Sequence, residues 1–405
     1  MAWSLTNGLP LRSRSKLSER ASTPDALPLP VEMILMIMRH LNSEDMYSAL
    51  QTCRAMRSIV ETCLYAHIFI PPHHKVRMTK LLRTLHTRPD LAHNIITFSG
   101  SLYPASPKPR FPRVITPTSL VKNWCQRWST KQPDPQMTVI SIHRMMNVKS
   151  LTLYDFAWLG TTSETLVRDA ICSTISLTSL TSLAIQGRDF FQPGRHLHYN
   201  RELSLILRHQ PLLERLELRS GDWDLGSWIL PTDIPRLTHL MSPPAEAIVL
   251  VPRRPVKFLV LREMLALPDQ MFWGALAASA SPIHTLKVGI LQHEVLLSFL
   301  HSLSVNLQDI QHLSLNGPDY EHLPMLTQGF PSLSSLRTLH VTLWDHQACQ
   351  VDGVDSDQLR EDRRADLIAR VRLKCPQFES LEYDHFSRCG CGSRLYLSTR
   401  EATSI

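Results

Sequence analysis

Eight short segments in the C-terminal part of the chain repeat one spacing of apolar residues, L-x-x-L-x-L or a relaxed form of it. Their central leucines are Leu151, Leu183, Leu216, Leu259, Leu286, Leu313, Leu339 and Leu381. A ninth unit, Ile234-Pro-Arg-Leu237-Thr-His-Leu240, lies in the longest interval and, with Leu237 taken as its centre, divides that interval into steps of 21 and 22 residues. This spacing predicts short, half-buried strands, and their recurrence makes internal repetition the strongest constraint on the fold.

The stretches between these strands have helical character, which we expect at residues 163–174, 202–208, 271–280, 294–303 and 358–374. A strand followed by a helix, repeated along the chain, is the plan of a leucine-rich-repeat solenoid with a parallel sheet. Each leucine row then points inward and is buried by stacking on the neighbouring units. Strands alternating with helices also fit a doubly wound α/β domain, but the short, similar strands and their repeated spacing favour the solenoid.

Residues 29–65 show helical spacing in three short bursts. The apolar positions are Met33, Ile34, Ile37, Met38 and Leu41 in the first, Met46, Ala49, Leu50 and Cys53 in the second, and Met56, Ile59, Val60, Cys63 and Leu64 in the third. Pro30 and Glu32 suit the first turn of the first helix, and Ser43 is the expected N-cap of the second. Three helices within about 40 residues bury too little surface to be stable alone, so we expect this module to need a partner.

Charge and proline content set the middle of the chain apart. Residues 71–149 hold 13 Lys and Arg against 2 Asp and Glu, a net +11, whereas residues 150–405 hold 23 against 28, a net −5. Frequent prolines interrupt the pattern there, and we expect only two helices, near residues 76–85 and 119–128. The predicted organisation is a flexible arm (1–24), the three-helix module (25–70), a basic Pro-rich connector (71–145), the solenoid (146–386) and a C-terminal tail (387–405).

The three-helix module resembles the F-box family closely. The family's pattern is LPxE, an aliphatic stripe, a D-[LM] step and a C-[RK]-x-W core. Here the pattern reads Leu29-Pro30-x-Glu32-Met33, then Ile37 and Leu41, then Asp45-Met46 and Leu50, then Cys53-Arg54 with Arg57, Val60 and Leu64-Tyr65. The sequence departs at Met56 and Tyr65, where Trp is frequent, but Met is apolar and adaptable enough to pack in its place. The segment 81–92 looks like the linker of fungal F-box proteins that carry repeat domains.

The resemblance implies that the module docks on the small Skp-type adaptor, which joins it to a cullin scaffold that carries the ubiquitin-transfer machinery. The contact residues it implies are Leu29, Pro30, Glu32, Met33, Ile37, Leu41, Leu50, Cys53, Met56 and Val60. An apolar stripe too large for so small a module is best buried by another chain. The alternative is that these residues pack only against one another or against the solenoid.

The residue arrangements that catalysis requires are missing from the sequence. It has no G-x-S-x-G, no G-x-x-x-x-G-K-[ST] and no G-x-G-x-x-G after a strand. His293-Glu294 begins like a zinc-protease helix, but Leu297 stands where the second histidine must be. We therefore predict a non-catalytic protein.

Clusters of possible metal ligands lack the required spacing. They are Cys389-Gly-Cys391 with Cys375 and His385, then His73-His74, His196-Leu-His198, and the acidic run Asp352, Asp355, Asp357, Glu361 and Asp362. Zinc sites space paired cysteines by two to four residues, and the acidic run lacks the register of a calcium loop. We predict no metal and no cofactor.

The basic connector raises nucleic-acid binding as a different class of function. Lys122, Trp124, Arg127, Trp128 and Lys131 combine cations with aromatic rings, which grip phosphates and stack on bases. Trp124 and Trp128 are four residues apart, however, and also fit the buried face of a helix. The basicity is confined to one segment, so nucleic acid is not the favoured partner.

Composition excludes two further classes. No run of about 18 apolar residues occurs, so we expect no bilayer-spanning helix and no membrane partner. The N-terminus lacks the apolar region of a secretory signal, the eight cysteines form no dense framework, and no Asn is followed two places later by Ser or Thr. The expected location is the cytoplasm or nucleus.

The resemblance to the F-box family, together with the repeat pattern, implies a substrate-recognition subunit of an SCF-type cullin ubiquitin ligase, with the F-box on the adaptor and the solenoid on an unknown protein substrate. Residues that flank the inward leucines face outward and are the expected substrate contacts: Arg215, Glu217, Arg219, Arg262, Lys287, His312, His340 and Asp384. The alternatives are a repeat-domain interaction scaffold outside a ligase, or nucleic-acid binding through the basic connector.

Overall fold

The computed structural model describes residues 29–71, 74–100, 141, 144–154, 177–186, 203–220, 225–226, 228–262, 268–289, 293–319, 330–345, 355–388 and 394–395. The chain divides into two compact units, an N-terminal unit of Met1–Thr181 with Ile185–Arg188, and a C-terminal unit of Ser182–Ala184 with Asp189–Ile405. The expected helices at 119–128 and 163–174 lie outside the described residues.

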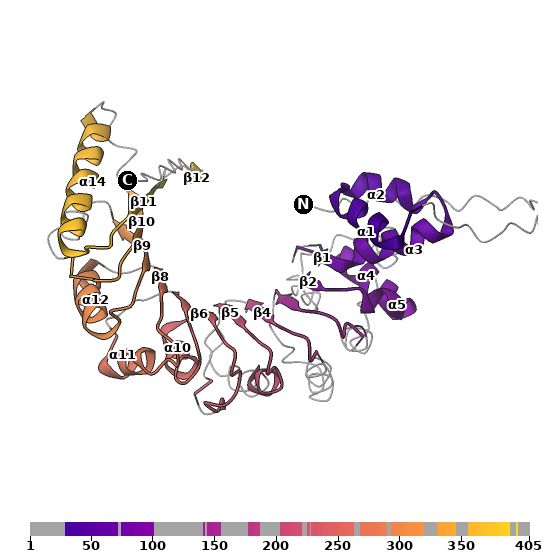
Figure 1. The fold of residues 1–405 in the computed structure, drawn as a ribbon, viewed down its shortest axis with the longest axis horizontal. Helices are drawn as coiled ribbons and strands as arrows, with labels where there is room; N and C mark the ends of the chain where they lie inside the picture. Colours follow the sequence, from indigo (N-terminus) through magenta and orange to yellow (C-terminus); the bar gives the residue numbers. More distant parts are fainter. Residues whose placement is uncertain are drawn as a thin grey trace, which may run out of the picture. The chain divides into compact units, whose positions relative to one another are not determined.

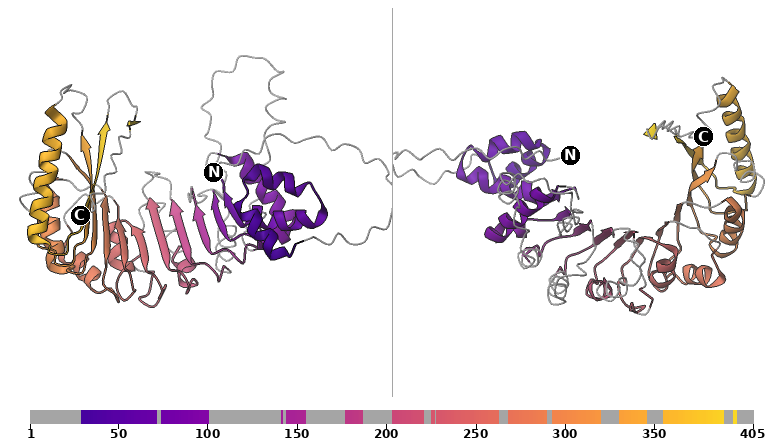
Figure 2. Two further views of the ribbon diagram at one scale, coloured as in Figure 1. Left: turned by 45° about the horizontal axis from the view of Figure 1, so that its top comes forward. Right: turned by 180° about the vertical axis from the view of Figure 1, so that it is seen from behind.

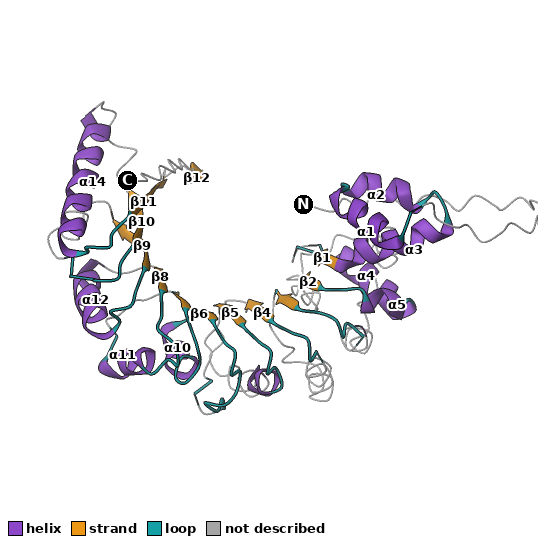
Figure 3. Ribbon diagram, viewed as in Figure 1, coloured by secondary structure: helices purple, strands orange, loops and turns teal. Residues whose placement is uncertain are grey.

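The elements are shown in Figure 3. The helices are α1 (Val31–His40), α2 (Ser43–Leu50), α3 (Arg54–Ala66), α4 (Lys75–Thr87), α5 (Pro89–His93), α10 (Pro244–Leu250), α11 (Gln270–Ala277), α12 (His293–Asn306) and α14 (Asp355–Lys374). The strands are β1 (His67–Phe69), β2 (Thr97–Gly100), β3 (Ser150–Leu153), β4 (Ser182–Gln186), β5 (Arg215–Ser220), β6 (His239–Ser242), β7 (Phe258–Leu261), β8 (Thr285–Gly289), β9 (His312–Asp319), β10 (Thr338–Asp345), β11 (Ser380–Arg388) and β12 (Arg394–Leu395).

The three helices expected between residues 29 and 65 are confirmed as α1, α2 and α3, with one correction at a cap. The N-cap of α2 is Asn42, whose Oδ1 accepts a hydrogen bond from the backbone N–H of Asp45 at 2.9 Å. Ser43, the expected cap, is instead the first residue of the helix. Asn is at least as good a cap as Ser, and the residue that caps is the one whose backbone is still extended.

The sheet of the N-terminal unit begins immediately after α3. Ala66 ends the helix and His67 starts β1, which pairs in parallel with β2, and β2 pairs in parallel with β3. The first two strands were not expected, because β2 carries Phe98 where the repeat pattern has its central leucine; Phe98 is paired with Leu151 of β3. The expected helix near residues 76–85 is confirmed as α4.

In the C-terminal unit each strand pairs with the next one along the chain. Strands β5 to β11 are parallel, and β12 runs antiparallel to β11. The pairing puts one leucine of each strand opposite a leucine of the next: Leu216, Leu240, Leu259, Leu286, Leu313, Leu339 and Leu381. All seven are buried. The strands predicted from the repeat pattern are confirmed, and the strand order lacks the reversal that defines a doubly wound sheet.

The position of the ninth unit in this row was wrong by three residues. Leu240, not Leu237, is paired with Leu216 and Leu259, and the steps are therefore unequal. Leu237 takes the position before the strand and is buried there. The third apolar position of the unit is held by Ser242, which is paired with Leu261 and is fully buried. A serine in that place hides the L-x-L signature.

The helices of the C-terminal unit lie on one side of its strands (Figure 1), and two further directions of view agree (Figure 2). Helices α11, α12 and α14 confirm the ranges expected at 271–280, 294–303 and 358–374, and residues 203–208 are helical as expected. Trp273 contacts its neighbour Phe272 in α11 and Phe299 of α12, with ring centroids 5.2 and 5.3 Å away. These rings pack α11 against α12. No described helix of this unit covers the opposite face of the strands, which we call the open face (Figure 1).

Arg254 is a charged residue in the core of the C-terminal unit. Its side chain is fully buried, and its guanidinium donates to the backbone carbonyls of Asp233, Leu230 and Val249 at 2.7, 2.7 and 3.0 Å. Burial lowers the pKa of Arg254, which the nearby Asp233 partly offsets. One side chain thus satisfies carbonyl groups of the 230–233 loop and of the C-terminal end of α10.

Replacing Arg254 with Met should therefore destabilise the C-terminal unit by about 3 kcal/mol or more, because several buried carbonyls lose their donor. The midpoint of urea unfolding of the full chain, followed by circular dichroism, measures this. Arg236→Met, at an exposed arginine before β6, is the matched control and should leave the midpoint unchanged. Equal midpoints for the two variants would show that Arg254 has no structural role.

Candidate functional site

The three N-terminal helices share a small apolar core of their own. It consists of Ile34 and Met38 from α1 with Ile59, Val60 and Leu64 from α3, all buried. Helix α2 adds half-buried side chains to the same cluster, among them Met46 and Leu50. The core uses only one side of α1, so the fate of the other side decides what the module can do.

The opposite side of α1 exposes a row of apolar residues. Leu29 is 41% exposed, Met33 45%, Met36 55% and Ile37 46%. Met33, Met36 and Ile37 follow helical spacing of three and four residues, so these side chains lie on one face of α1, and Leu29 lies just before the N-cap Pro30. Val31 and, on α2, Tyr47 are also exposed. A cluster of large apolar side chains left in solvent on one short helix indicates a binding surface.

The structure divides the expected adaptor-contact residues into three groups. Those at the surface are Leu29, Pro30, Glu32, Met33 and Ile37, and those half-buried between the helices are Leu41, Leu50, Cys53 and Met56. Cys53 is the N-cap of α3, where its Sγ accepts from the backbone N–H of Met56 at 3.4 Å. Val60 is 0% exposed and lies in the module's own core, so it offers no surface to another chain.

Three exposed apolar residues of α1 and α2 are not among the contacts predicted from the sequence: Val31, Met36 and Tyr47. The sequence predicts one apolar stripe through Met33, Ile34, Ile37, Met38 and Leu41. In the structure α3 covers Ile34 and Met38, while Met33 and Ile37 stay exposed. The spacing from Leu29 through Met33 to Met36 was the available signal for the outer face.

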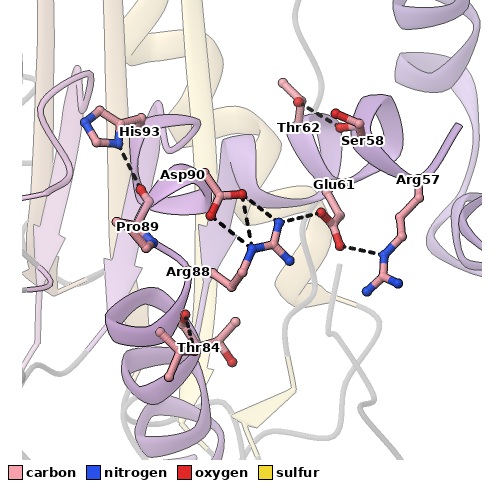
Figure 4. Close-up of polar contacts among 10 residues, drawn as sticks. Arg57, Ser58, Glu61, Thr62, Thr84, Arg88, Pro89, Asp90 and His93 are labelled. Carbon is pink, nitrogen blue, oxygen red and sulfur yellow. Dashed lines mark hydrogen bonds and ion pairs between the residues drawn. The ribbon is translucent and has the colours of Figure 1, made fainter. Parts of the chain in front are cut away.

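A chain of ion pairs joins the module to the segment that follows it (Figure 4). Arg88, at the start of α5, contacts Glu61 of α3 at 2.9 Å and Asp90 at 2.6 Å. Arg57 contacts the other oxygen of Glu61 at 3.1 Å. The Glu61 side chain is only 13% exposed. Helix α3 is therefore held by α5 through charges as well as by its continuation into β1.

These contacts shift the titration of both carboxyl groups. Burial raises the pKa of Glu61, but hydrogen bonds from Arg88 and Arg57 outweigh it, so the pKa of Glu61 lies below its usual value. The hydrogen bonds from Arg88 likewise lower the pKa of Asp90. Both groups are thus ionised at neutral pH, where they stabilise the folded state.

Three of the expected substrate-contact residues form an ion-pair group on β5. Glu217 lies between Arg215 and Arg219, with Arg215 Nη2 2.6 Å from Glu217 Oε1 and Arg219 Nη2 2.7 Å from Glu217 Oε2. The Glu217 side chain is only 7% exposed, whereas Arg215 is 54% and Arg219 38% exposed. Glu217 therefore positions two arginines and offers little surface of its own.

The other expected contacts are spread over the neighbouring strands. Lys287 and His312 are exposed, and Arg262 and His340 are half-buried. His312 Nδ1 shares a hydrogen bond with Thr338 Oγ1 of β10, and His340 Nδ1 shares one with Ser314 Oγ of β9 at 2.9 Å. Asp384 is on β11, paired with Thr342. Lys287, His312 and His340 alternate with the buried residues of their strands and therefore lie on the open face of the sheet.

Among the described residues, no group of three or more His, Cys, Asp or Glu side chains is arranged to hold a metal ion. Cys389, Cys391, His73, His196 and His198 lie outside the described residues. Cys53, Cys63 and Cys375 are free thiols. None of the described helices is both long and apolar enough to cross a membrane.

The comparisons with known proteins agree with the geometry of the three helices. A family model described as F-box-like matches residues 27–71, which spans α1 to β1. No curated protein matches the chain. The chain thus contains an F-box-like domain, a domain typical of substrate adaptors of SCF-type ubiquitin ligases and of proteins that bind Skp-type adaptors.

Truncating a side chain in the core of the module and truncating one on its exposed face should lower the stability by different amounts. Val60→Ala should lower the free energy of unfolding by about 2 kcal/mol, because it leaves a cavity in the small core. Ile37→Ala should lower it by no more than about 1 kcal/mol, because about half of the side chain is already in solvent. Thermal unfolding of the full chain distinguishes the two. A larger loss for Ile37→Ala would mean that α1 is turned with its other face inward.

The ion pairs around Arg88 should make the stability of the folded chain depend on pH. A lowered pKa in the folded state means that the stabilisation is present above the unfolded-state pKa, about 4.3 for Glu, and is lost as pH falls through the folded-state pKa. The midpoint of urea unfolding should therefore fall more steeply below about pH 5 in the natural chain than in Glu61→Gln. Glu44→Gln, at an exposed position of α2, should follow the natural chain. Parallel curves for Glu61→Gln and the natural chain would contradict the assignment.

Proposed function

We propose that this protein is a substrate-recognition subunit of an SCF-type cullin ubiquitin ligase. In this role the F-box-like helices bind a Skp-type adaptor, the adaptor binds the cullin scaffold, and the C-terminal unit holds the protein to be ubiquitylated. The protein itself contributes no catalytic residue. The observation that carries the proposal is the exposed apolar face of α1 within a segment that matches an F-box-like model.

The size of that face supports a stable contact. Leu29, Met33, Met36 and Ile37 each keep about half of their surface in solvent. Complete burial of such a side chain is worth about 1.5–3 kcal/mol, so burying the exposed half of each contributes roughly 1 kcal/mol. Val31 on α1 and Tyr47 on α2 are exposed as well. We therefore include Val31, Met36 and Tyr47 among the proposed contacts and leave Val60 out.

The proposed contact with the adaptor also involves polar and half-buried residues. Pro30 is the N-cap of α1, where its carbonyl accepts from the N–H groups of Met33 and Ile34, and Glu32 is exposed in the first turn. Leu41, Leu50, Cys53 and Met56 support the module from within and reach the surface only in part. Their role in the proposal is to hold the exposed row in place.

For the C-terminal unit we propose a leucine-rich-repeat-like solenoid that binds the substrate. In-register leucines on consecutive parallel strands, with helices on one side, are what such a repeat requires. The open face of the strands then carries the proposed contacts: Arg215, Glu217, Arg219, Arg262, Lys287, His312, His340 and Asp384. We also propose the division into module, connector and solenoid at residues 25–70, 71–145 and 146–386.

Association with a Skp-type adaptor tests the first half of the proposal. Met33→Asp combined with Ile37→Asp places charges in the exposed row and should weaken adaptor binding at least roughly a hundredfold, since each buried charge lacks a partner. Leu29→Ala with Pro30→Ala should also abolish co-purification. Calorimetry with the purified full chain and adaptor measures the affinity.

The control places the same change on an exposed apolar residue elsewhere. Leu373→Asp, on α14, is 86% exposed in the natural chain and should leave adaptor binding unchanged. Circular dichroism verifies that each variant is folded. A natural chain that does not bind the adaptor would instead favour an interaction scaffold that works outside a ligase.

A further inference from the structure

The open face of β5 to β8 gathers positive charge in a part of the chain that is acidic as a whole. Arg215, Arg219, Arg262 and Lys287 all lie on this face, while residues 150–405 carry 23 Lys and Arg against 28 Asp and Glu. Among the described outward positions of these four strands, Glu217 is the one carboxylate. Both of its oxygens are engaged by Arg215 and Arg219. The face therefore attracts anionic groups.

The centre of the same face is apolar. Met241 of β6 is paired with Val260 of β7, and both side chains are half-buried. In the same row Glu217 is paired with Met241, and Lys287 is paired with Val260. The row thus runs from the arginine-bound carboxylate through two apolar side chains to a lysine.

Phe258 completes this centre in the adjacent row. Its ring is stacked on His239 with centroids 5.4 Å apart, and Lys287 Nζ lies 5.6 Å from its centroid. A cation within about 6 Å of an aromatic face is attracted to it, so Lys287 is held at the edge of the apolar centre. Burial and the neighbouring Arg215 lower the pKa of His239, against a smaller opposite effect of Glu214, so His239 adds neutral aromatic surface.

We propose that this face, the β5–β8 patch, binds a short acidic segment of a partner protein that carries an apolar side chain between its carboxylates. This inference rests on the proposed function and names the chemistry of the substrate segment. An apolar centre with a charged rim is the arrangement of energetically important protein interfaces. The apolar side chain contacts Met241, Phe258 and Val260, and the carboxylates contact Arg215, Arg219, Arg262 and Lys287.

The dimensions of the patch fit such a segment. Neighbouring strands are about 4.8 Å apart and residues along a strand rise about 3.3 Å, so the patch measures roughly 14 Å across β5 to β8 and roughly 13 Å from Arg215 to Arg219. An extended peptide of about four or five residues spans that distance. A nucleic acid needs a longer basic track and gains nothing from the apolar centre.

Fluorescence anisotropy with the full chain tests the proposal. The probe is a fluorescein-labelled peptide of Glu-Glu-Leu repeats, compared with Gln-Gln-Leu and Glu-Glu-Ser repeats of the same length. We expect the first to bind roughly tenfold or more tightly than either of the others, because each of them lacks one half of the match. Equal affinity for the Glu-Glu-Leu and Gln-Gln-Leu peptides, or no binding of the former, would overturn the proposal.

Charge reversal locates the binding on the patch. Arg262→Glu with Lys287→Glu should weaken Glu-Glu-Leu binding roughly tenfold or more, because like charges then face each other. Both side chains are outside the Glu217 ion-pair group, so the group stays intact. The matched control is Arg236→Glu with Arg372→Glu, at exposed arginines outside the strands β5 to β8, and it should bind as the natural chain does. Equal losses in both double variants would overturn the location.

Two further measurements separate this proposal from its rivals. A labelled DNA duplex that binds more tightly than the peptide and is released by Arg262→Glu with Lys287→Glu would assign the patch to nucleic acid instead. Adaptor binding should be unchanged in the same variant. If adaptor binds and peptide does not, this inference alone fails, whereas peptide binding without adaptor binding means that only the proposed ligase role fails.

Discussion

The alignment of one leucine from each strand with a leucine of the next is the constraint on which the C-terminal unit depends. No strand of four to nine residues buries its apolar side alone, and each leucine is covered only because its neighbours along the sheet are in the same register. A slip of one residue would turn the leucines to the open face. Because the register is fixed on the inner side, the outer side chains are equally fixed, and charges from separate repeats meet in the β5–β8 patch.

Much of this fold was predictable from the sequence, because the repeated leucines directly reflect burial. The repeat pattern does not reveal a strand where a different residue type occupies the leucine position. Phe98 fills it in β2, and Ser242 replaces the third apolar residue of β6, which moved the expected centre from Leu240 to Leu237. Arg254 gave no signal either, since its function as a donor to loop carbonyls depends on contacts that only the folded chain creates.

The F-box-like module shows the limit of periodicity more sharply. The sequence identified the apolar residues of α1 but did not tell which of them face inward, because adjacent pairs such as Met33 with Ile34, and Ile37 with Met38, are both apolar. Packing of α3 makes the choice, covering Ile34 and Met38. Family resemblance did not supply the missing information, since it placed Val60 among the adaptor contacts although the residue is completely buried.

The passage from α3 into β1 within one peptide bond has a mechanical consequence. Ala66 is the last residue of the helix, and its carbonyl accepts a hydrogen bond from the N–H of Ile96, the residue before β2. Bending at this point would break that hydrogen bond and the pairing of β1 with β2. The ion pair of Arg88 with Glu61 also holds α3 in place. A protein that binds the outer face of α1 therefore also fixes the orientation of β1, β2 and β3.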